Sequence, residues 1–125
     1  MFAALCDDDK YITEEIKKLL LEYAKDNRIT IDIDEFESGE ELLNSEKNYD
    51  IIVLDYQLGS TDGLTVAKEL RKQNVLSSII FLTSYPNFMI DAFEVNTFRF
   101  LLKPIDKSKF FKAIDDYIKI VDANY

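Results

Sequence analysis

Short apolar runs alternate with longer amphipathic segments along the whole chain. The runs at 2–6, 51–54 and 78–82 are almost entirely apolar, which is typical of strands that are buried on both faces of a parallel sheet. A further run at 97–102 has the length of a strand. Between 29 and 34, isoleucines alternate with polar residues, which indicates a half-buried strand at a sheet edge. The pattern therefore predicts five strands.

The first three segments between these runs have the periodicity of helices. After the first run, apolar residues recur at helical offsets, at Ile12, Ile16, Leu19, Leu20 and Tyr23. The residues from Ser38 to Glu41 form a capping box, which predicts the start of a second helix. A loop at 59–63 then precedes a third helix, whose inward face carries Leu64, Ala67 and Leu70.

Two more helices are predicted after the run at 78–82. Pro86 suits the first turn of a helix, because its missing N–H costs nothing there, and we expect this helix to turn Ile90 and Phe93 inward. Asp106 is a suitable N-cap for the last helix. The expected buried stripe of that helix consists of Phe110, Phe111, Ile114, Ile118 and Val121.

Five successive strand and helix units predict an α/β fold of the flavodoxin-like class, a doubly wound (βα)5 arrangement with helices on both faces of a parallel five-stranded sheet. Right-handed crossovers leave few topologies. We predict the strand order 2-1-3-4-5, because it places the first and third strands side by side and brings the acidic residues at their ends together. Residues 1–125 are expected to form one domain.

Composition narrows the function classes. The chain has 125 residues, 47% of them hydrophobic, which is enough for a real core. Its net charge of -9 argues against direct binding of nucleic acid by this segment. Cys6 is the single cysteine and is expected to be a small buried hydrophobe. The apolar runs are too short to cross a membrane and no signal peptide is present, so we expect a soluble cytoplasmic protein.

Acidic, hydroxyl and basic residues stand where the predicted strands end. They are Asp7, Asp8 and Asp9 after the first run, Asp55 after the third, Thr83 after the fourth and Lys103 after the fifth. Taken singly, each has an ordinary interpretation: Asp9 is an expected helix N-cap, and a lone lysine before a proline is usually a solvated loop charge. In a parallel sheet, however, ligands bind just beyond the carboxyl ends of the strands. The set therefore predicts one shared pocket.

Three carboxylates in one pocket need a cation or a proton to offset their repulsion. Asp7, Asp8 and Asp55 offer only oxygen ligands, which suit Mg²⁺, and the chain has no histidine. Asp55 is the expected nucleophile, since a carboxylate can accept a phosphoryl group to give an acyl phosphate. Lys103 would supply a fixed positive charge and Thr83 a hydroxyl to a phosphoryl oxygen.

Together these residues give the chain a specific resemblance to a known family. The matching pieces are Cys6-Asp7-Asp8-Asp9, Leu54-Asp55 with Gly59 and Asp62-Gly63, Phe81-Leu82-Thr83-Ser84, and Leu102-Lys103-Pro104. In these pieces the chain resembles the response-regulator receiver domain, and the resemblance runs from about residue 2 to residue 121. It implies that a sensor histidine kinase transfers a phosphoryl group from its phosphohistidine to Asp55.

The resemblance also implies the roles of individual residues. Mg²⁺ would be held by Asp8, Asp55 and the backbone carbonyl of Gln57, with waters ordered by Asp7, while Lys103 would pair with the phosphoryl group. Thr83 and Phe100 would form the switch that alters the surface of the fourth helix and fifth strand. Gln57 and Tyr85 would tune dephosphorylation. A cis bond is intrinsically a minority outcome before proline, but the resemblance favours it at Lys103-Pro104, where it would aim the ammonium group inward.

The stretch from 91 to 104 resembles receivers that precede LytTR-type DNA-binding domains. Phe100 stands where that subgroup more often has Tyr, and Arg99 stands where a smaller or acidic residue is frequent. The resemblance implies control of transcription through a DNA-binding domain outside this chain. It also implies a homodimer through the fourth helix, fifth strand and fifth helix.

Other functions remain open at this point. A stand-alone receiver that acts through protein–protein contacts would share all of these residues. An aspartyl-phosphate hydrolase of the haloacid dehalogenase type needs a second acid two residues after the nucleophile, where this chain has Gln57. A flavodoxin would want a phosphate-binding loop after the first strand in place of acids. We therefore expect a signalling domain whose catalysis is limited to its own phosphorylation and dephosphorylation, and not a turnover enzyme.

Overall fold

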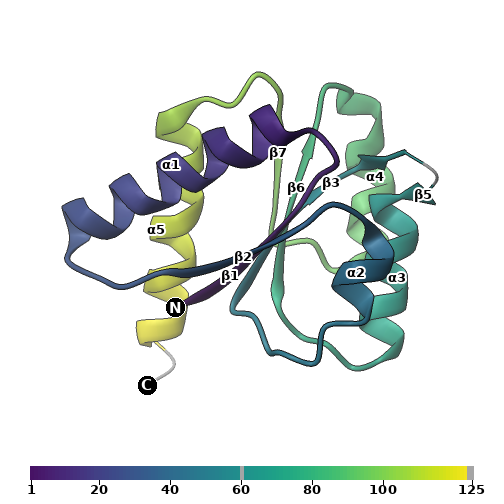
Figure 1. Cartoon of the computed structure of the whole chain (residues 1–125), viewed down its shortest axis with the longest axis horizontal. Helices are drawn as coiled ribbons and strands as arrows, with labels where there is room; N and C mark the ends of the chain where they lie inside the picture. The colour runs from purple at the N-terminus through teal and green to yellow at the C-terminus, as the bar shows by residue number, and fades with distance from the viewer. Residues whose placement is uncertain (60, 124–125) are drawn as a thin grey trace.

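Five parallel strands form one sheet in the order β2-β1-β3-β6-β7 (Figure 1). Their bounds are β1 (Phe2–Cys6), β2 (Asp32–Phe36), β3 (Ile51–Asp55), β6 (Ser78–Thr83) and β7 (Arg99–Leu102). The computed structural model describes residues 1–59 and 61–123. In the order of the five sheet strands along the chain, this arrangement is 2-1-3-4-5. The predicted flavodoxin-like fold and its strand order are confirmed.

Helices cover both faces of the sheet, as predicted. Figure 1 shows α1 (Lys10–Asn27) and α5 (Lys107–Ala123) on one side. The other side carries α2 (Gly39–Leu43), α3 (Gly63–Lys72) and a segment made of η1 (Pro86–Phe88), α4 (Met89–Ala92) and η2 (Phe93–Val95). A small antiparallel pair forms between β4 (Gln57–Leu58), just before the predicted loop at 59–63, and β5 (Thr61–Asp62), within that loop.

Each strand supplies both cores, because successive side chains point to opposite faces. Ala3 and Leu5 of β1 pack against α1 and α5, whereas Ala4 and Cys6 pack on the side of α2 and α3. Cys6 is 1% exposed, and burial raises the pKa of its thiol to about 12. It is therefore a neutral core residue, as expected.

The predicted helix caps are in place. The Asp9 carboxylate accepts a hydrogen bond from Tyr11 N at 2.9 Å, and that of Asp106 accepts one from Lys109 N at 3.1 Å. Ser38 Oγ accepts a hydrogen bond from Glu41 N at 3.2 Å. In a standard capping box the Glu41 carboxylate would accept a hydrogen bond from Ser38 N. Here it accepts one from Glu37 N instead, one residue earlier.

The edge strand begins later than the isoleucine pattern suggests. Arg28 ends α1 in the left-handed conformation, with φ of 54°, and Ile29 N donates to Ala24 O at 3.0 Å. This bond belongs to the helix end and takes the N–H of Ile29 away from the strand. The first link to the neighbouring strand is the bond from the Met1 amino group to Thr30 O at 2.9 Å. β2 pairs with β1 from Asp32 onward, at the sheet edge that was predicted.

The prediction that Ile90 and Phe93 face inward is wrong. They are 77% and 75% exposed, and Ala92 and Val95 fill the buried positions instead. The expected helix is divided into two short 3-10 turns around a single four-residue α-helix. A segment this short has no extended helical stripe, so its contacts with neighbouring elements decide which residues are buried.

Arg71 fixes the end of this segment. Its guanidinium donates to Val95 O and Val75 O, both at 2.8 Å, to Ser77 O at 2.9 Å and to Asn96 O at 3.2 Å. The five N–H donors of arginine in a planar fork make such a cluster of bonds possible. The side chain thereby ties the end of α3 to the start of β6 and the end of η2.

We expect Arg71→Met to lower the free energy of unfolding by about 2–3 kcal/mol, because bonds from a charged donor are lost and partly buried carbonyls lose their partners. Urea unfolding measures the change, provided that the slope of the unfolding free energy against urea concentration is the same in both proteins. The neighbouring exposed Lys72 supplies the control: Lys72→Met should change stability by less than about 0.5 kcal/mol. Equal effects of the two substitutions would contradict the role of the Arg71 hydrogen bonds in joining α3 to β6 and η2.

Candidate functional site

Three acidic side chains meet where β1 and β3 end. Asp7 and Asp8 follow β1, Asp55 is the last residue of β3, and the two strands are neighbours in the sheet. One carboxylate oxygen from each of the three lies within 4.8 Å of the others. Asp7 and Asp55 are buried and Asp8 is exposed. The predicted strand order therefore does bring these acids together.

Backbone turns at the strand ends orient the two buried carboxylates. Asp7 Oδ1 accepts a hydrogen bond from Asp9 N at 2.8 Å, and Asp55 Oδ1 accepts one from Gln57 N at 3.3 Å. Both bonds join a side chain to the N–H two residues later, as in an Asx-turn. Because β1 ends at Cys6, Asp7 and Asp8 are free of the alternation that would send them to opposite faces.

Lys103 reaches the same point from the strand at the opposite edge. Its Nζ lies 3.3 Å from Asp55 Oδ1 and 3.5 Å from Asp7 Oδ2, and its side chain is 18% exposed. Lys103 N donates to Thr83 O at 2.7 Å, and the Lys103-Pro104 bond is cis, the form that the resemblance favours. The end of β7, the strand next to β6, thus supplies the ammonium group that faces the acids.

Thr83 ends β6, the strand between β3 and β7. It is fully buried, and it lies one residue beyond Leu82, the partner of Asp55 in the parallel ladder. Thr83 Oγ1 accepts a hydrogen bond from Tyr85 N at 3.2 Å. The hydroxyl hydrogen is not used in that bond, so Thr83 keeps a donor for an oxygen at the strand ends.

The charges at this site do not balance. Three carboxylates face one ammonium group. Burial raises the pKa of the Asp7 carboxyl to about 6, and the nearby Asp55 charge acts in the same direction. Burial also raises the pKa of Asp55, against the opposing effect of Lys103. The buried pair therefore resists full ionisation unless a further positive charge is present.

The residues fit a small divalent cation. All donors in the cluster are carboxylate oxygens, which Mg²⁺ prefers, and Asp8 is the one open to solvent and its waters. Gly59 adds room: its φ is +64°, and a Cβ at this position would lie 3.3 Å from Asp8 Oδ2. Any other residue would be strained there and would press on the Asp8 carboxylate.

The remaining predicted residues lie around this centre. Gln57 has an exposed side chain, and its N–H contacts Asp55. Phe100 of β7 is partly buried against the core on the side of α2 and α3. Tyr85 is 49% exposed, and its ring meets the edge of Phe88 at a centroid distance of 5.8 Å. The structure therefore gathers Asp7, Asp8, Asp55 and Lys103 directly, and it does not place Phe100 or Tyr85 in contact with them.

Two residues beside the acids have no structural role predicted from the sequence: Gly63 enters as part of the resemblance, and Tyr56 carries no prediction at all. Gly63 begins α3, and a Cβ there would lie 2.4 Å from Asp55 O, so only glycine lets α3 approach the end of β3 this closely. Tyr56, directly after Asp55, is 5% exposed and stacks on Phe88 with a centroid distance of 4.3 Å. An aromatic residue after a strand-end acid was the available signal, but its partner lies 32 positions later in the sequence.

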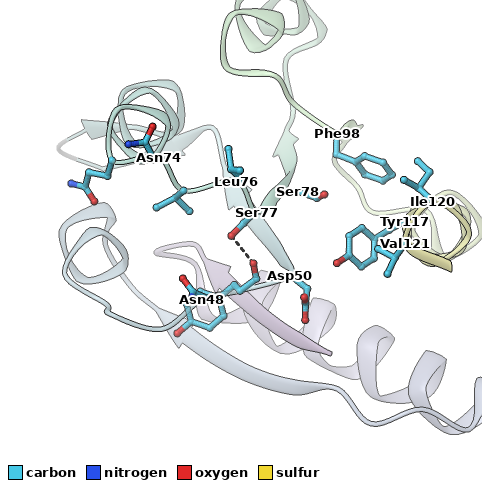
Figure 2. Close-up of a pocket in the computed structure, with 13 residues that line it drawn as sticks. Asn48, Asp50, Asn74, Leu76, Ser77, Ser78, Phe98, Tyr117, Ile120 and Val121 are labelled. Atoms are coloured by element: carbon cyan, nitrogen blue, oxygen red, sulfur yellow. Dashed lines mark hydrogen bonds between the residues drawn. The ribbon is translucent and has the colours of Figure 1, made fainter. Parts of the chain in front are cut away.

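A separate hollow of about 660 Å³ lies at the opposite end of the sheet (Figure 2). Figure 2 shows Phe98, Tyr117 and Val121 on one side of it, facing Asp50 and Ser77 near the starts of β3 and β6. Asp7, Asp8, Asp55 and Lys103 are not among the residues that line this hollow. This hollow is therefore separate from the cluster of Asp7, Asp8, Asp55 and Lys103.

Comparison with known families identifies this arrangement. The family profile described as "Response regulator receiver domain" matches residues 3–115. The chain belongs to this family. The matched range includes all five residues of the site, namely Asp7, Asp8, Asp55, Thr83 and Lys103.

Curated relatives of the receiver domain have signalling names. "Sensory transduction protein LytT" of Bacillus cereus is 33% identical over 120 residues, covering 95% of this chain and 48% of that protein. "Sensory transduction protein LytR" of Staphylococcus epidermidis is 32% identical over 117 residues, covering 92% and 45% respectively. The chain spans about half the length of the curated relatives it matches. These relatives agree with the predicted resemblance to LytTR-type receivers.

Solved structures share the fold. The response regulatory domain of protein mrkE from Klebsiella pneumoniae has a TM-score of 0.86 and 21% identity, covering 98% of this chain and 99% of that chain. The response regulator TrrA from Thermotoga maritima, in complex with Mg²⁺-BeF, has a TM-score of 0.80 and 28% identity, covering 93% and 97%.

No helix within the described ranges 1–59 and 61–123 of this receiver is both long and apolar enough to cross a membrane.

The raised pKa of Asp7 predicts a pH-dependent stability in metal-free buffer. A carboxyl whose pKa rises from 3.8 to about 6 on folding binds protons more tightly in the folded state, so it destabilises the fold as pH rises from about 4 through 6. Asp7→Asn removes that charge and keeps an acceptor for Asp9 N. We expect it to raise the free energy of unfolding at pH 7 by about 1–3 kcal/mol.

Urea unfolding in EDTA at pH 7 and pH 5 measures this effect. The gain from Asp7→Asn should shrink at pH 5, where Asp7 of the natural protein already carries a proton. Asp26→Asn, at an exposed position of α1, is the control and should be near neutral at both values. An Asp7→Asn variant less stable than the natural protein at pH 7 would contradict the charge crowding.

Proposed function

We propose that this receiver domain accepts a phosphoryl group on Asp55 from the phosphohistidine of a sensor histidine kinase. The observation that carries the proposal is the position of Lys103 Nζ, 3.3 Å from Asp55 Oδ1, in a cluster that also holds Asp7 and Asp8. A buried carboxylate among charges of both signs suits the transfer of an anionic group. Membership of the receiver family supports this reading.

In the transfer, an Asp55 oxygen forms a bond to phosphorus as the bond from phosphorus to the histidine nitrogen breaks. The electron pair of that bond leaves with the imidazole, which then takes up a proton. Lys103 offsets negative charge on the phosphoryl oxygens, and the Thr83 hydroxyl donates to one of them. Asp55 must be ionised to attack, which the Lys103 ammonium favours.

We assign a Mg²⁺ site to Asp8, Asp55 and the backbone carbonyl of Gln57, with Asp7 ordering bound water. The ion would neutralise charge on the phosphoryl oxygens. The open position of Asp8 and the glycine at 59 suit such a site. The Mg²⁺-BeF complex of the 28% identical TrrA supports the assignment.

The output of the reaction is a change in the surface of α4 and β7. Thr83 and Phe100 are the proposed switch, and the acyl phosphate would favour one of two packings. The surface already carries exposed large apolar residues, namely Met89, Ile90, Phe93 and Leu102. We propose a homodimer through α4, β7 and α5 on this face, since exposed apolar residues that cluster favour association.

We propose that the signal ends in transcription, through a LytTR-type DNA-binding domain that is not in this chain. The support is the likeness to proteins named LytT and LytR, about half of whose length this chain spans. The net charge of -9 argues against direct contact between this segment and DNA, and we infer a cytoplasmic location. A receiver that acts by protein contacts alone is the second candidate, and the exposed apolar face of α4 favours it.

Incubation with acetyl phosphate and MgCl₂, followed by intact-mass measurement, tests the acceptor directly. The natural chain should gain the mass of one phosphoryl group, and Asp55→Asn should gain none. Asp26→Asn should be phosphorylated like the natural chain, because Asp26 is exposed on α1. Phosphorylation of the Asp55→Asn variant, or none of the natural chain, would refute the proposal.

Tyr85 is proposed to slow the attack of water on the acyl phosphate. It follows Thr83 by two residues, and its N–H binds Thr83 Oγ1 while its ring is half exposed. Tyr85→Ala should shorten the lifetime of phosphorylated Asp55 by about 2- to 10-fold, because a small side chain no longer screens the site. Loss of the phosphoryl mass over time gives the rate, and an unchanged rate would rule out screening.

A further inference from the structure

Tyr56 and Phe88 join the acceptor strand to the connection that carries Thr83. Their rings are nearly parallel, with an interplanar angle of 9° and a centroid distance of 4.3 Å. Tyr56 also meets Phe81 of β6 at 5.5 Å, and Tyr85 lies edge-on to Phe88. The stack thus bridges the residue directly after Asp55 and the first turn after β6.

The Tyr56 side of this stack is fixed by the backbone. Tyr56 N donates to Leu82 O at 2.9 Å, and Gly63 N donates to Tyr56 O at 2.6 Å. The ring is 5% exposed, so packing leaves it little freedom. Tyr56 therefore offers an immobile surface one residue from Asp55.

The Phe88 side belongs to a short turn, in which Phe88 N donates to Tyr85 O at 3.3 Å and the ring packs against the core. Phe88 ends the 3-10 turn η1, which begins without a side-chain cap, and it is the half-buried residue of that turn. The same connection holds Tyr85 N, which donates to Thr83 Oγ1 at 3.2 Å. The position of this connection thus bears on where the Thr83 hydroxyl points, and α4 starts at the next residue, Met89.

We infer that Tyr56 is a positioning residue: by stacking on Phe88, it holds the β6–α4 connection so that the Thr83 hydroxyl is set for the phosphoryl group on Asp55. This inference rests on the proposed function and adds a residue to it. Tyr56 touches neither the phosphoryl group nor the acids' cation, and acts through Phe88 and the turn at Tyr85. Pre-set donors aid transfer because no rearrangement is needed during reaction.

The ring of Tyr56 makes the stack on Phe88, while its hydroxyl hydrogen-bonds the side chain of Asp91 on α4. Burial raises the pKa of the Tyr56 hydroxyl to about 12, and the Asp91 charge on α4 acts in the same direction, so the side chain stays neutral. The stack itself needs the ring and not the hydroxyl. Tyr56→Phe should therefore preserve function, while Tyr56→Leu should not.

The test is the initial rate of phosphorylation by acetyl phosphate and MgCl₂, followed by intact mass. We expect Tyr56→Leu and Phe88→Leu each to slow the rate by about 3- to 10-fold, in line with the size of an aromatic pair. The double variant should be no slower than either single variant, because both changes remove the same contact. The single variants Tyr56→Phe and Phe88→Tyr keep an aromatic ring at each position and should retain the natural rate.

Phe111→Leu is the matched control, since it removes another partly buried ring, which pairs edge-on with Tyr23 at 5.3 Å between α1 and α5. It should leave the rate unchanged. Natural rates in the Tyr56→Leu and Phe88→Leu variants, or slowing that adds in the double variant, would overturn the positioning role while leaving phosphorylation of Asp55 intact. Failure of the natural chain to be phosphorylated would instead overturn the proposed function, and the positioning role with it.

Discussion

Repulsion among Asp7, Asp8 and Asp55 is the constraint on which the rest of this site depends. Their carboxylate oxygens lie within 4.8 Å of one another, and one ammonium group, that of Lys103, faces them. Burial makes the imbalance costly, since it raises the pKa of both Asp7 and Asp55. A site that is short of positive charge binds a divalent cation readily and, with that cation, tolerates a transferred phosphoryl group.

The topology of the sheet creates this crowding. β1 and β3 are adjacent although α1, β2 and α2 lie between them in the sequence, and this reversal of strand order leaves the ends of both strands open. β6 and β7 then add Thr83 and Lys103 from the other side. The same strands whose apolar residues form the two cores thus end at the five polar residues of the site, so fold stability and chemistry share one scaffold.

Much of this could be predicted from the sequence, because the signals are local. Short, largely apolar strands that end at Asp55 or directly before Lys103 indicate both the sheet and its polar edge. The inward face of α4 could not be predicted, since a four-residue helix has no periodicity to follow, and Ala92 is buried in place of Ile90. The Tyr56–Phe88 stack and the hydrogen bonds of Arg71 join residues distant in sequence, so only the folded chain shows them.

The most direct test of the central claim is the melting temperature of the protein with and without MgCl₂. If the three carboxylates repel one another around a cation site, millimolar Mg²⁺ should raise the melting temperature of the natural chain by about 3–6 °C. The rise should be largely lost in Asp8→Asn and kept in Asp26→Asn. A melting temperature of the natural chain that Mg²⁺ does not move, or an equal rise in Asp8→Asn, would contradict the account.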